Sequence, residues 1–249
     1  MSTQPTILVI FGISGDLSTR FLLKSLAKIS KVGMLPKDFR ILGITRKKGL
    51  QIAELLKDES DLSELKDHLE IFSMDTEDPS GYERLDAYLL EIEREFPSKP
   101  QRIFYLSIPP AIAKGVIGQI GESNLSKRGE YKILLEKPFG TNLESATDLA
   151  KHVDRYFKEN EIYRVDHYLA KETAQNIIVF REGNSLFKKI WNRDFIESIE
   201  IIATESIDIE GRASFYEQTG ALRDVIQSHL LQLLALVLMK LPEEGEQIP

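Results

Sequence analysis

Cysteine is absent from the 249 residues of this chain, and histidine is scarce, with 4 residues. The absence of cysteine excludes disulfide scaffolds, thiol nucleophiles and thiolate metal sites, and it is compatible with a reducing, cytoplasmic environment. The histidines show no spacing typical of metal ligands, so no metal site is expected. Positive charge is in deficit, since the net charge is -7, and this disfavours a general nucleic-acid or membrane surface. Any phosphate-binding site must therefore be local.

Long hydrophobic runs are missing as well. The opening MSTQPTILVIFGISG has no basic leader, and its apolar run is too short for a signal or a membrane anchor. The run HLLQLLALVLMK is shorter than the ~20 residues that cross a bilayer, so we interpret it as a core helix. With 42% apolar residues, the chain has enough material for a core, and we expect a soluble globular protein.

Short apolar runs alternate with helical patterns through the first part of the chain. This βαβ rhythm predicts a parallel sheet, and therefore an α/β fold of the doubly wound Rossmann type. The expected strands are TILVIFG (6–12), FRILGIT (39–45), EIFSMD (70–75), RIFYLSI (102–108) and KILLEKPFG (132–140). Helices are expected at 17–32, at 50–69, at 81–95, after Pro110 and at 142–157.

The pattern changes near residue 168, so we predict a nucleotide-binding domain over 1–168 and a second domain over 169–249. The second is expected to contain a helix at 171–182, one long alternating strand at 195–206 and a helix at 220–240. A lone strand leaves both of its edges unpaired, and a nearly all-apolar helix needs cover on several sides. We therefore expect an incomplete α+β substrate domain.

A glycine-containing turn is expected where the first strand meets the first helix. The stretch ILVIFGISGDLSTRFL places Gly12 and Gly15 there. Glycine lets the backbone approach a ligand closely, and free amides at a helix start bind a pyrophosphate. The pattern is G-x-x-G-D-L rather than G-x-G-x-x-G, ligand-free turns also use glycine, and Asp16 is an ordinary anion for a first helical turn. By itself, the turn indicates a dinucleotide site without establishing one.

The end of the second expected strand indicates which dinucleotide binds. An NAD site usually places Asp or Glu there, whereas GITRKK offers Thr45, Arg46, Lys47 and Lys48. Cations favour a 2′-phosphate, and a solvated basic turn is the alternative interpretation. Together with the glycine turn, the pattern favours NADP, with Arg46 as the best candidate for binding the 2′-phosphate.

Four separated stretches together resemble one enzyme family. In chain order they are GISGDLSTR, LLEKPFGTN, RVDHYLAKE and GALRDVIQSHLLQ. The sequence closely resembles glucose-6-phosphate dehydrogenase over nearly its whole length, and RVDHYLAKE is very specific to that family, differing from the usual form only at Val165 and Ala170. The resemblance implies NADP-dependent oxidation of D-glucose 6-phosphate to 6-phospho-D-glucono-1,5-lactone, the first step of the pentose phosphate pathway.

The oxidation of a hemiacetal alcohol requires a base for the hydroxyl proton, and an imidazole with a near-neutral pKa is suitable. Our candidate is His229, which follows Asp224 on an otherwise apolar helix and, taken alone, would be interpreted as a core or interface histidine. The resemblance implies that His229 is the proton acceptor. It also implies that Asp166 hydrogen-bonds to His229, which would fix the imidazole tautomer and stabilise the imidazolium.

Further contacts follow from the same resemblance. His167, Tyr168 and Lys171 are implied to bind the sugar phosphate; on a helix His167 and Lys171 would share a face, although a surface helix start is the alternative. Lys137 is implied to contact substrate and cofactor, and a lysine extending to solvent from a strand end is the alternative. The other implied contacts are Glu205 and Asp224 with the sugar hydroxyls, and Gly12, Ser14, Gly15, Asp16, Leu17, Arg46 and Tyr105 with the cofactor.

The chain departs from the family pattern in a few places. Phe21 replaces a common basic residue, and Ser228 stands where Asn usually precedes the histidine. Family members also continue well beyond Pro249, and a homo-oligomer, a dimer, is expected when that C-terminal part is present. Two alternatives remain open: a glucose-fructose oxidoreductase type of dehydrogenase, which shares the E-K-P motif, and a truncated dinucleotide-binding fragment without autonomous activity.

Overall fold

The computed structural model describes residues 4–56, 60–127, 129–204, 217 and 220–241. The chain divides into two compact units, Met1–Val165 and Asp166–Pro249. Among the described residues, no helix combines the length and the apolar character that a bilayer crossing requires.

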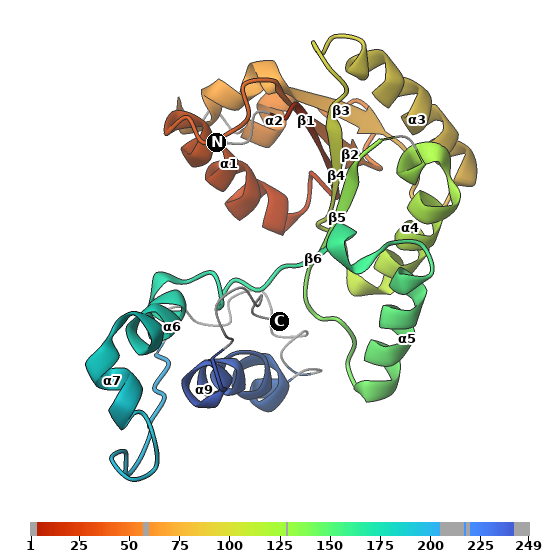
Figure 1. Ribbon diagram of the computed structural model, residues 1–249. Coiled ribbons are helices and arrows are strands. Elements are labelled where there is room, and N and C mark those ends of the chain that lie inside the picture. Colours follow the sequence, from red (N-terminus) through yellow and green to blue (C-terminus); the bar gives the residue numbers. More distant parts are fainter. Residues whose placement is uncertain (1–3, 57–59, 128, 205–216, 218–219, 242–249) are drawn as a thin grey trace. The chain divides into compact units, whose positions relative to one another are not determined.

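A parallel sheet of 6 strands forms the centre of the first unit (Figure 1). Its order is β3-β2-β1-β4-β5-β6, and every neighbouring pair is parallel. The chain reverses its winding direction between β1 and β4, which makes this place the topological switch point of a doubly wound fold. The strands are β1 (Thr6–Phe11), β2 (Phe39–Thr45), β3 (Leu69–Ser73), β4 (Gln101–Leu106), β5 (Tyr131–Leu135) and β6 (Ile162–Arg164). The predicted Rossmann-type fold is confirmed.

Helices cover both faces of the sheet, so the central strand β1 is buried along its whole length. Ile7 and Val9 contact the apolar cluster on one face, whereas Leu8 and Ile10 contact the cluster on the other. One face carries η1 (Ser18–Leu22), α1 (Leu23–Lys31), α2 (Ile52–Leu56) and η2 (Ser60–His68). The opposite face carries α3 (Pro79–Glu93), α4 (Pro110–Glu122) and α5 (Leu143–Asp154), with short 3₁₀ turns η3 (Asn124–Ser126) and η4 (Glu159–Glu161).

The predicted elements of this unit are confirmed with small differences. The helix predicted at 17–32 starts with π-helical hydrogen bonding in η1, and the stretch at 50–69 is a short α-helix followed by a 3₁₀ helix. The strand predicted at 132–140 ends at Leu135, because Pro138 has no amide to donate to a sheet. The short edge strand β6 was not predicted, since its 3 residues are too few for a periodic pattern.

A buried ion cluster holds α3 against the sheet. Arg102 on β4 is fully buried; its Nε donates to Glu93 at 2.7 Å, and its Nη1 donates to Asp86 at 3.1 Å. The same Nη1 reaches the carbonyl of Leu125 in η3 at 3.3 Å. A buried guanidinium is tolerated only with such partners, and removing one partner of a buried pair costs about 3–5 kcal/mol. Arg102 thereby fixes α3 and η3 on the strand that borders the switch point.

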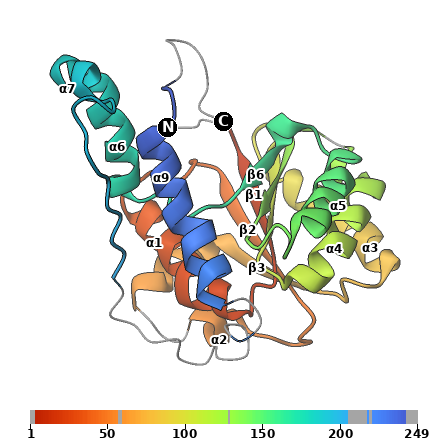
Figure 2. The same ribbon diagram turned by 90° about the horizontal axis from the view of Figure 1, so that it is seen from below.

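The described part of the second unit is helical. It contains α6 (Glu172–Gly183), α7 (Ser185–Ile190), η6 (Leu222–Leu230) and α9 (Leu231–Leu238). The segments η6 and α9 are continuous, which confirms the helix predicted at 220–240, and α9 packs along α6 (Figure 2). The helix predicted at 171–182 is also confirmed as α6, whereas α7 was not predicted.

The strand predicted at 195–206 is wrong over 195–204, and residues 205–206 lie outside the described residues. Alternating apolar residues suit one face of a sheet, but backbone amides need a neighbouring strand, and no strand is present in the described part of the second unit. Phe195 and Ile202 are instead 68% and 73% exposed. The pattern alone therefore did not produce a strand.

Candidate functional site

The glycine turn lies at the switch point, where β1 ends. Gly12 has a φ of +83°, and a Cβ at this position would lie 2.2 Å from the Ser107 carbonyl oxygen, just after β4. The Gly15 amide donates to the Gly12 carbonyl at 2.9 Å, which closes the turn before the helix begins. Only glycine fits such a close approach at a positive φ. The cradle is of the kind that receives a pyrophosphate at a helix start.

Two hydroxyl contacts join this turn to neighbouring strand ends. Ser18 Oγ donates to Ser107 Oγ at 2.9 Å, and Ser14 Oγ lies 3.1 Å from Thr45 Oγ1. The sequence did not indicate these pairs, because the partners are far apart in the chain. The available signal was only that Thr45 ends β2 and that Ser107 follows β4.

The basic turn after β2 is held in place by Thr45. The Lys47 amide donates to Thr45 Oγ1 at 3.2 Å, and Ser73 Oγ donates to the Lys47 carbonyl at 3.0 Å. Arg46 and Lys48 are exposed beside this ordered backbone. The turn therefore presents cations next to the glycine cradle, and no carboxylate occupies the end of β2.

The predicted residues after β1 and β4 have different environments. Asp16 and Leu17 are exposed at the helix start, where Asp16 pairs with Arg20 at 3.4 Å. The Tyr105 hydroxyl on β4 donates to the Glu136 carboxylate. Burial, and secondarily that carboxylate, raise the pKa of Tyr105, so the phenol keeps its proton. Tyr105 thus holds the residue directly before Lys137.

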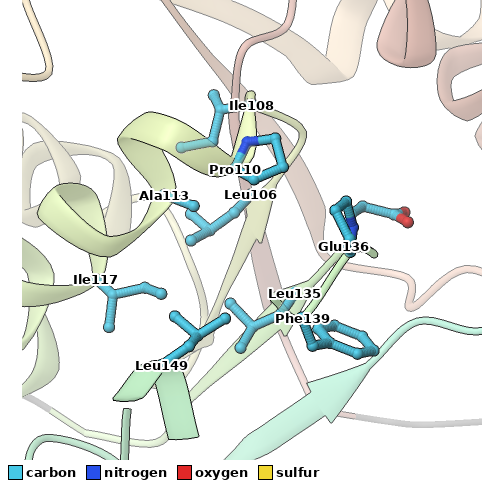
Figure 3. A pocket seen from close by; sticks show the side chains of 10 residues that line it. Leu106, Ile108, Pro110, Ala113, Ile117, Leu135, Glu136, Phe139 and Leu149 are labelled. Carbon is cyan, nitrogen blue, oxygen red and sulfur yellow. The ribbon is translucent and has the colours of Figure 1, made fainter. Parts of the chain in front are cut away.

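Lys137 follows β5 at the same edge of the sheet, and it is half-buried. A small, mostly apolar pocket lies beside this segment, and Leu135, Phe139 and Leu149 are among the residues that line it (Figure 3). In this view the apolar side chains face one another, and the Glu136 carboxylate lies at their margin. The carboxyl ends of β1, β2, β4 and β5 therefore bring the predicted cofactor residues to one edge of the first unit.

In the second unit, residues 166–171 of the RVDHYLAKE segment form a turn rather than a helix. Asp166 Oδ1 accepts from the Tyr168 amide at 3.0 Å, and the Lys171 amide donates to the Tyr168 carbonyl at 3.2 Å. The prediction that His167 and Lys171 share a helical face is wrong, because α6 begins only at Glu172 and the aspartate holds a turn before it. The Lys171 ammonium nevertheless lies 3.8 Å from the centre of the Tyr168 ring.

His229 joins this cluster from η6. Its imidazole stacks on the Tyr168 ring with centroids 3.8 Å apart, and its centroid lies 4.9 Å from that of His167. The buried Tyr168 thus touches both the histidine and the lysine that the sequence separates by tens of residues. The structure brings His167, Tyr168, Lys171 and His229 together.

The hydrogen bonding of η6 also brings two of the predicted site residues, Asp224 and His229, toward the same face of the helix. Asp224 and His229 are five positions apart, and residues with that spacing point about 140° apart around an α-helix. The π-helical winding of η6 has i→i+5 bonds, so it brings such residues much closer to one face. Ser228 Oγ donates to the carbonyl of Arg223 at 2.7 Å. Sequence periodicity does not distinguish this winding from an α-helix.

One predicted residue, Glu205, lies outside the described residues. Phe21, the departure after the glycine turn, is exposed. The predicted site residues are otherwise divided between two groups. The first unit carries the candidate cofactor residues, and the second carries Asp166, Asp224, His229 and the candidate phosphate ligands.

A parallel sheet of order 3-2-1-4-5-6 with a glycine cradle at its switch point defines a dinucleotide-binding α/β protein of the Rossmann class. Residues 9–176 match the model of the glucose-6-phosphate dehydrogenase NAD binding domain, and residues 178–248 match the C-terminal domain of the same family. The chain therefore belongs to the glucose-6-phosphate dehydrogenase family. A nicotinamide dinucleotide is the cofactor that this family implies, and the glycine cradle fits it.

Curated relatives support the assignment. The glucose-6-phosphate 1-dehydrogenase of Aggregatibacter actinomycetemcomitans is 39% identical over 256 residues, which cover 97% of this chain and 52% of that protein. The Bacillus subtilis enzyme is 32% identical over 249 residues, covering 96% of this chain and 51% of that protein. The chain thus spans about half the length of the curated relatives it matches.

Solved structures agree with the sequence matches. A glucose-6-phosphate dehydrogenase in complex with its substrate glucose-6-phosphate is 33% identical with a TM-score of 0.89, covering 99% of this chain and 54% of that one. The Mycobacterium avium glucose-6-phosphate 1-dehydrogenase has a TM-score of 0.81 at 31% identity, covering 96% of this chain and 52% of that one.

The Gly12 cradle predicts a stability difference between two glycine substitutions. Gly12→Ala should lower the free energy of unfolding by about 2–4 kcal/mol, because a Cβ there combines a positive φ with a backbone clash. Gly115→Ala is the matched control: this position is in α4 with nothing within 4 Å of a Cβ, so a gain of about 0.5–1 kcal/mol is expected. Urea unfolding measures both, and equal effects would contradict the cradle geometry.

Proposed function

We propose that this protein oxidises D-glucose 6-phosphate to 6-phospho-D-glucono-1,5-lactone with NADP, the entry step of the pentose phosphate pathway, in the cytoplasm. The observation that carries the proposal is the cluster in which His229 meets Tyr168, His167 and Lys171. The oxidation of a phosphorylated sugar alcohol requires a proton acceptor and donors that bind the phosphate. In this cluster, one turn and one helix carry both.

His229 is the proposed general base. As the hydroxyl on C1 of the sugar becomes a carbonyl, the imidazole accepts its proton. Asp166 is proposed to hold the imidazole tautomer and to stabilise the imidazolium; its Oδ1 is already fixed by the Tyr168 amide, which orients the carboxylate. Asp224, brought toward the face of His229 by the winding of η6, is proposed to accept hydrogen bonds from sugar hydroxyls, as is Glu205.

The sugar phosphate is proposed to bind His167, Tyr168 and Lys171. Lys171 supplies an ammonium, His167 a ring nitrogen and Tyr168 a hydroxyl, all donors suited to phosphate oxygens. The side chains are already grouped, since the ring of Tyr168 contacts both of its neighbours. This grouping limits the entropy lost on binding.

The dinucleotide is proposed to be held by Gly12, Ser14, Gly15, Asp16, Leu17, Arg46, Tyr105 and Lys137. NADP, when bound, supplies the acceptor for the hydride that leaves C1. Arg46 is proposed to bind the 2′-phosphate, supported by its exposure beside the Thr45-fixed turn and by the lack of a carboxylate at that strand end. Lys137 is proposed to contact substrate and cofactor together.

Replacement of His229 tests the role of the base. With glucose 6-phosphate and NADP, the 249-residue chain should form reduced cofactor, measured by its absorbance, and His229→Asn should lower kcat by about 10²- to 10⁴-fold because general-base catalysis is lost. His152→Asn, on α5 of the first unit, is the control and should retain the rate. Undiminished turnover in His229→Asn would refute the assignment, and an inactive unsubstituted chain would favour the non-catalytic alternative.

Replacement of Lys171 tests the phosphate site. Lys171→Gln should raise KM for glucose 6-phosphate by about 10- to 100-fold, since a hydrogen bond to a charged group contributes about 1.5–3 kcal/mol. Inorganic phosphate should compete with the substrate in the unsubstituted chain and lose this effect in the variant. Lys189→Gln on α7 is the matched control. A normal KM and retained phosphate competition in Lys171→Gln would place the phosphate elsewhere.

Replacement of Arg46 tests the choice of cofactor. Arg46→Gln should raise Kd for NADP by about 10- to 100-fold and leave Kd for NAD nearly unchanged, because only NADP carries the 2′-phosphate. Cofactor titration followed by calorimetry measures both constants. Arg84→Gln, an exposed position on α3, serves as the control. A parallel loss for both dinucleotides would show that Arg46 does not read the 2′-phosphate.

A further inference from the structure

The C-terminal end of α9 is held by two side chains from other segments of the second unit. Arg181, in the last turn of α6, donates from Nη1 to the Leu236 carbonyl and from Nη2 to the Met239 carbonyl, the latter at 2.7 Å. Trp191, just after α7, donates from Nε1 to the Val237 carbonyl at 2.8 Å. Three carbonyls at one helix end are thus bound by side chains.

These contacts are expected to stabilise the C-terminal end of α9. The last carbonyls of a helix have no intrahelical donors, and a cation near them also interacts favourably with the helix dipole. Arg181 is only 7% exposed, and its guanidinium carbon lies 5.5 Å from the centre of the Trp191 ring, which shields the pair from water. The planar fork of arginine reaches two carbonyls at once, which the single ammonium of lysine does less well.

A second contact, near the candidate base, joins the segment that leads into α6 with the helix formed by η6 and α9. Tyr168, just before α6, stacks on His229, which lies in the helix continuous with α9. His229 and Leu236 are on the order of 10 Å apart along the helix axis, at about 1.5 Å per residue. Because α6 and α9 pack along each other between these two contacts, a fixed end at Arg181 limits sliding of the helix at His229 (Figure 2).

We propose that Arg181, together with Trp191, is a positioning residue: it sets the axial register of the η6–α9 helix against α6 and so holds the His229 imidazole on Tyr168. This role rests on the proposed function of His229 as the base. Neither Arg181 nor Trp191 touches the reacting atoms in this scheme. A displacement of about 1 Å in a reacting group costs on the order of 10²-fold in rate, so a small shift of this helix is sufficient to matter.

The direct test observes His229 itself. In the 249-residue chain with labelled histidines, the ring signals of His68, His152, His167 and His229 are assigned by NMR, using His229→Asn to identify that residue. Stacking on Tyr168 should give the His229 signal an upfield ring-current shift. In Arg181→Met this shift should shrink, while His68 and His152, in the first unit, stay unchanged and report an intact fold.

Matched variants separate positioning from general damage. Arg193→Met is the control, because Arg193 is in the same unit and its side chain is 96% exposed; its spectrum should match that of the unsubstituted chain. Arg181→Lys should give an intermediate shift, since lysine replaces part of the contact. Trp191→Phe removes only the donor to Val237 and keeps an aromatic ring, so it should produce a smaller displacement in the same direction.

Kinetics provide a second readout. In Arg181→Met, kcat should fall by about 10- to 100-fold, and KM for glucose 6-phosphate should change by a smaller factor, because Asp224 moves with the helix whereas the proposed phosphate ligands lie on the turn before α6. If the unsubstituted chain shows no turnover, the proposed function fails, and the NMR comparison still decides whether Arg181 positions His229.

An unchanged His229 signal in folded Arg181→Met would overturn the proposal. If Arg181→Met loses the folded second unit, Trp191→Phe becomes the deciding variant, and an unchanged His229 signal there would overturn it equally. A shift confined to His229, graded from Trp191→Phe and Arg181→Lys to Arg181→Met and absent in Arg193→Met, would support it.

Discussion

The approach of Gly12 to the carbonyl oxygen of Ser107 is the contact on which the first unit depends. It occurs where β1 and β4 lie side by side and the chain winds in opposite directions, so any bulk at Gly12 would push the strand ends apart. From there the Ser18–Ser107 and Ser14–Thr45 hydroxyl contacts extend the arrangement to the ends of β4 and β2. The candidate pyrophosphate cradle and the turn that presents Arg46 are thus parts of one hydrogen-bonded structure.

In the second unit, the arrangement of the candidate site residues depends on aromatic stacking. Tyr168 is buried between the imidazole of His229 and the ammonium of Lys171, so one ring aligns the candidate base with a candidate phosphate ligand. The turn that carries Tyr168 is held by the Asp166 carboxylate, the same group proposed to orient His229. A substitution at any of these residues would therefore affect the others, and the effects of such substitutions on the free energy of unfolding are not expected to be additive.

The two units differ in how well the sequence predicted them. In the first, apolar runs such as that of β1 are long and bounded by turns, and every predicted strand is present because both faces of the sheet are covered. In the second, the alternation at 195–204 predicted a strand that is absent, since alternation does not supply a pairing partner. Likewise, the spacing of His167 and Lys171 suggested a helical face, whereas the Asp166 side chain stabilises a turn there.

By itself, the sequence determined the parallel α/β fold, the glycine turn, the basic end of β2 and the family motifs, because local periodicity, glycine placement and charge are properties of neighbouring residues. The tertiary structure decided which distant groups meet: Thr45 with Ser14, Tyr105 with Glu136, Tyr168 with His229, and Arg181 with the end of α9. It also decided the π-helical winding that brings Asp224 toward the face of His229. These features depend on packing between segments remote in the chain, and no local pattern encodes that packing.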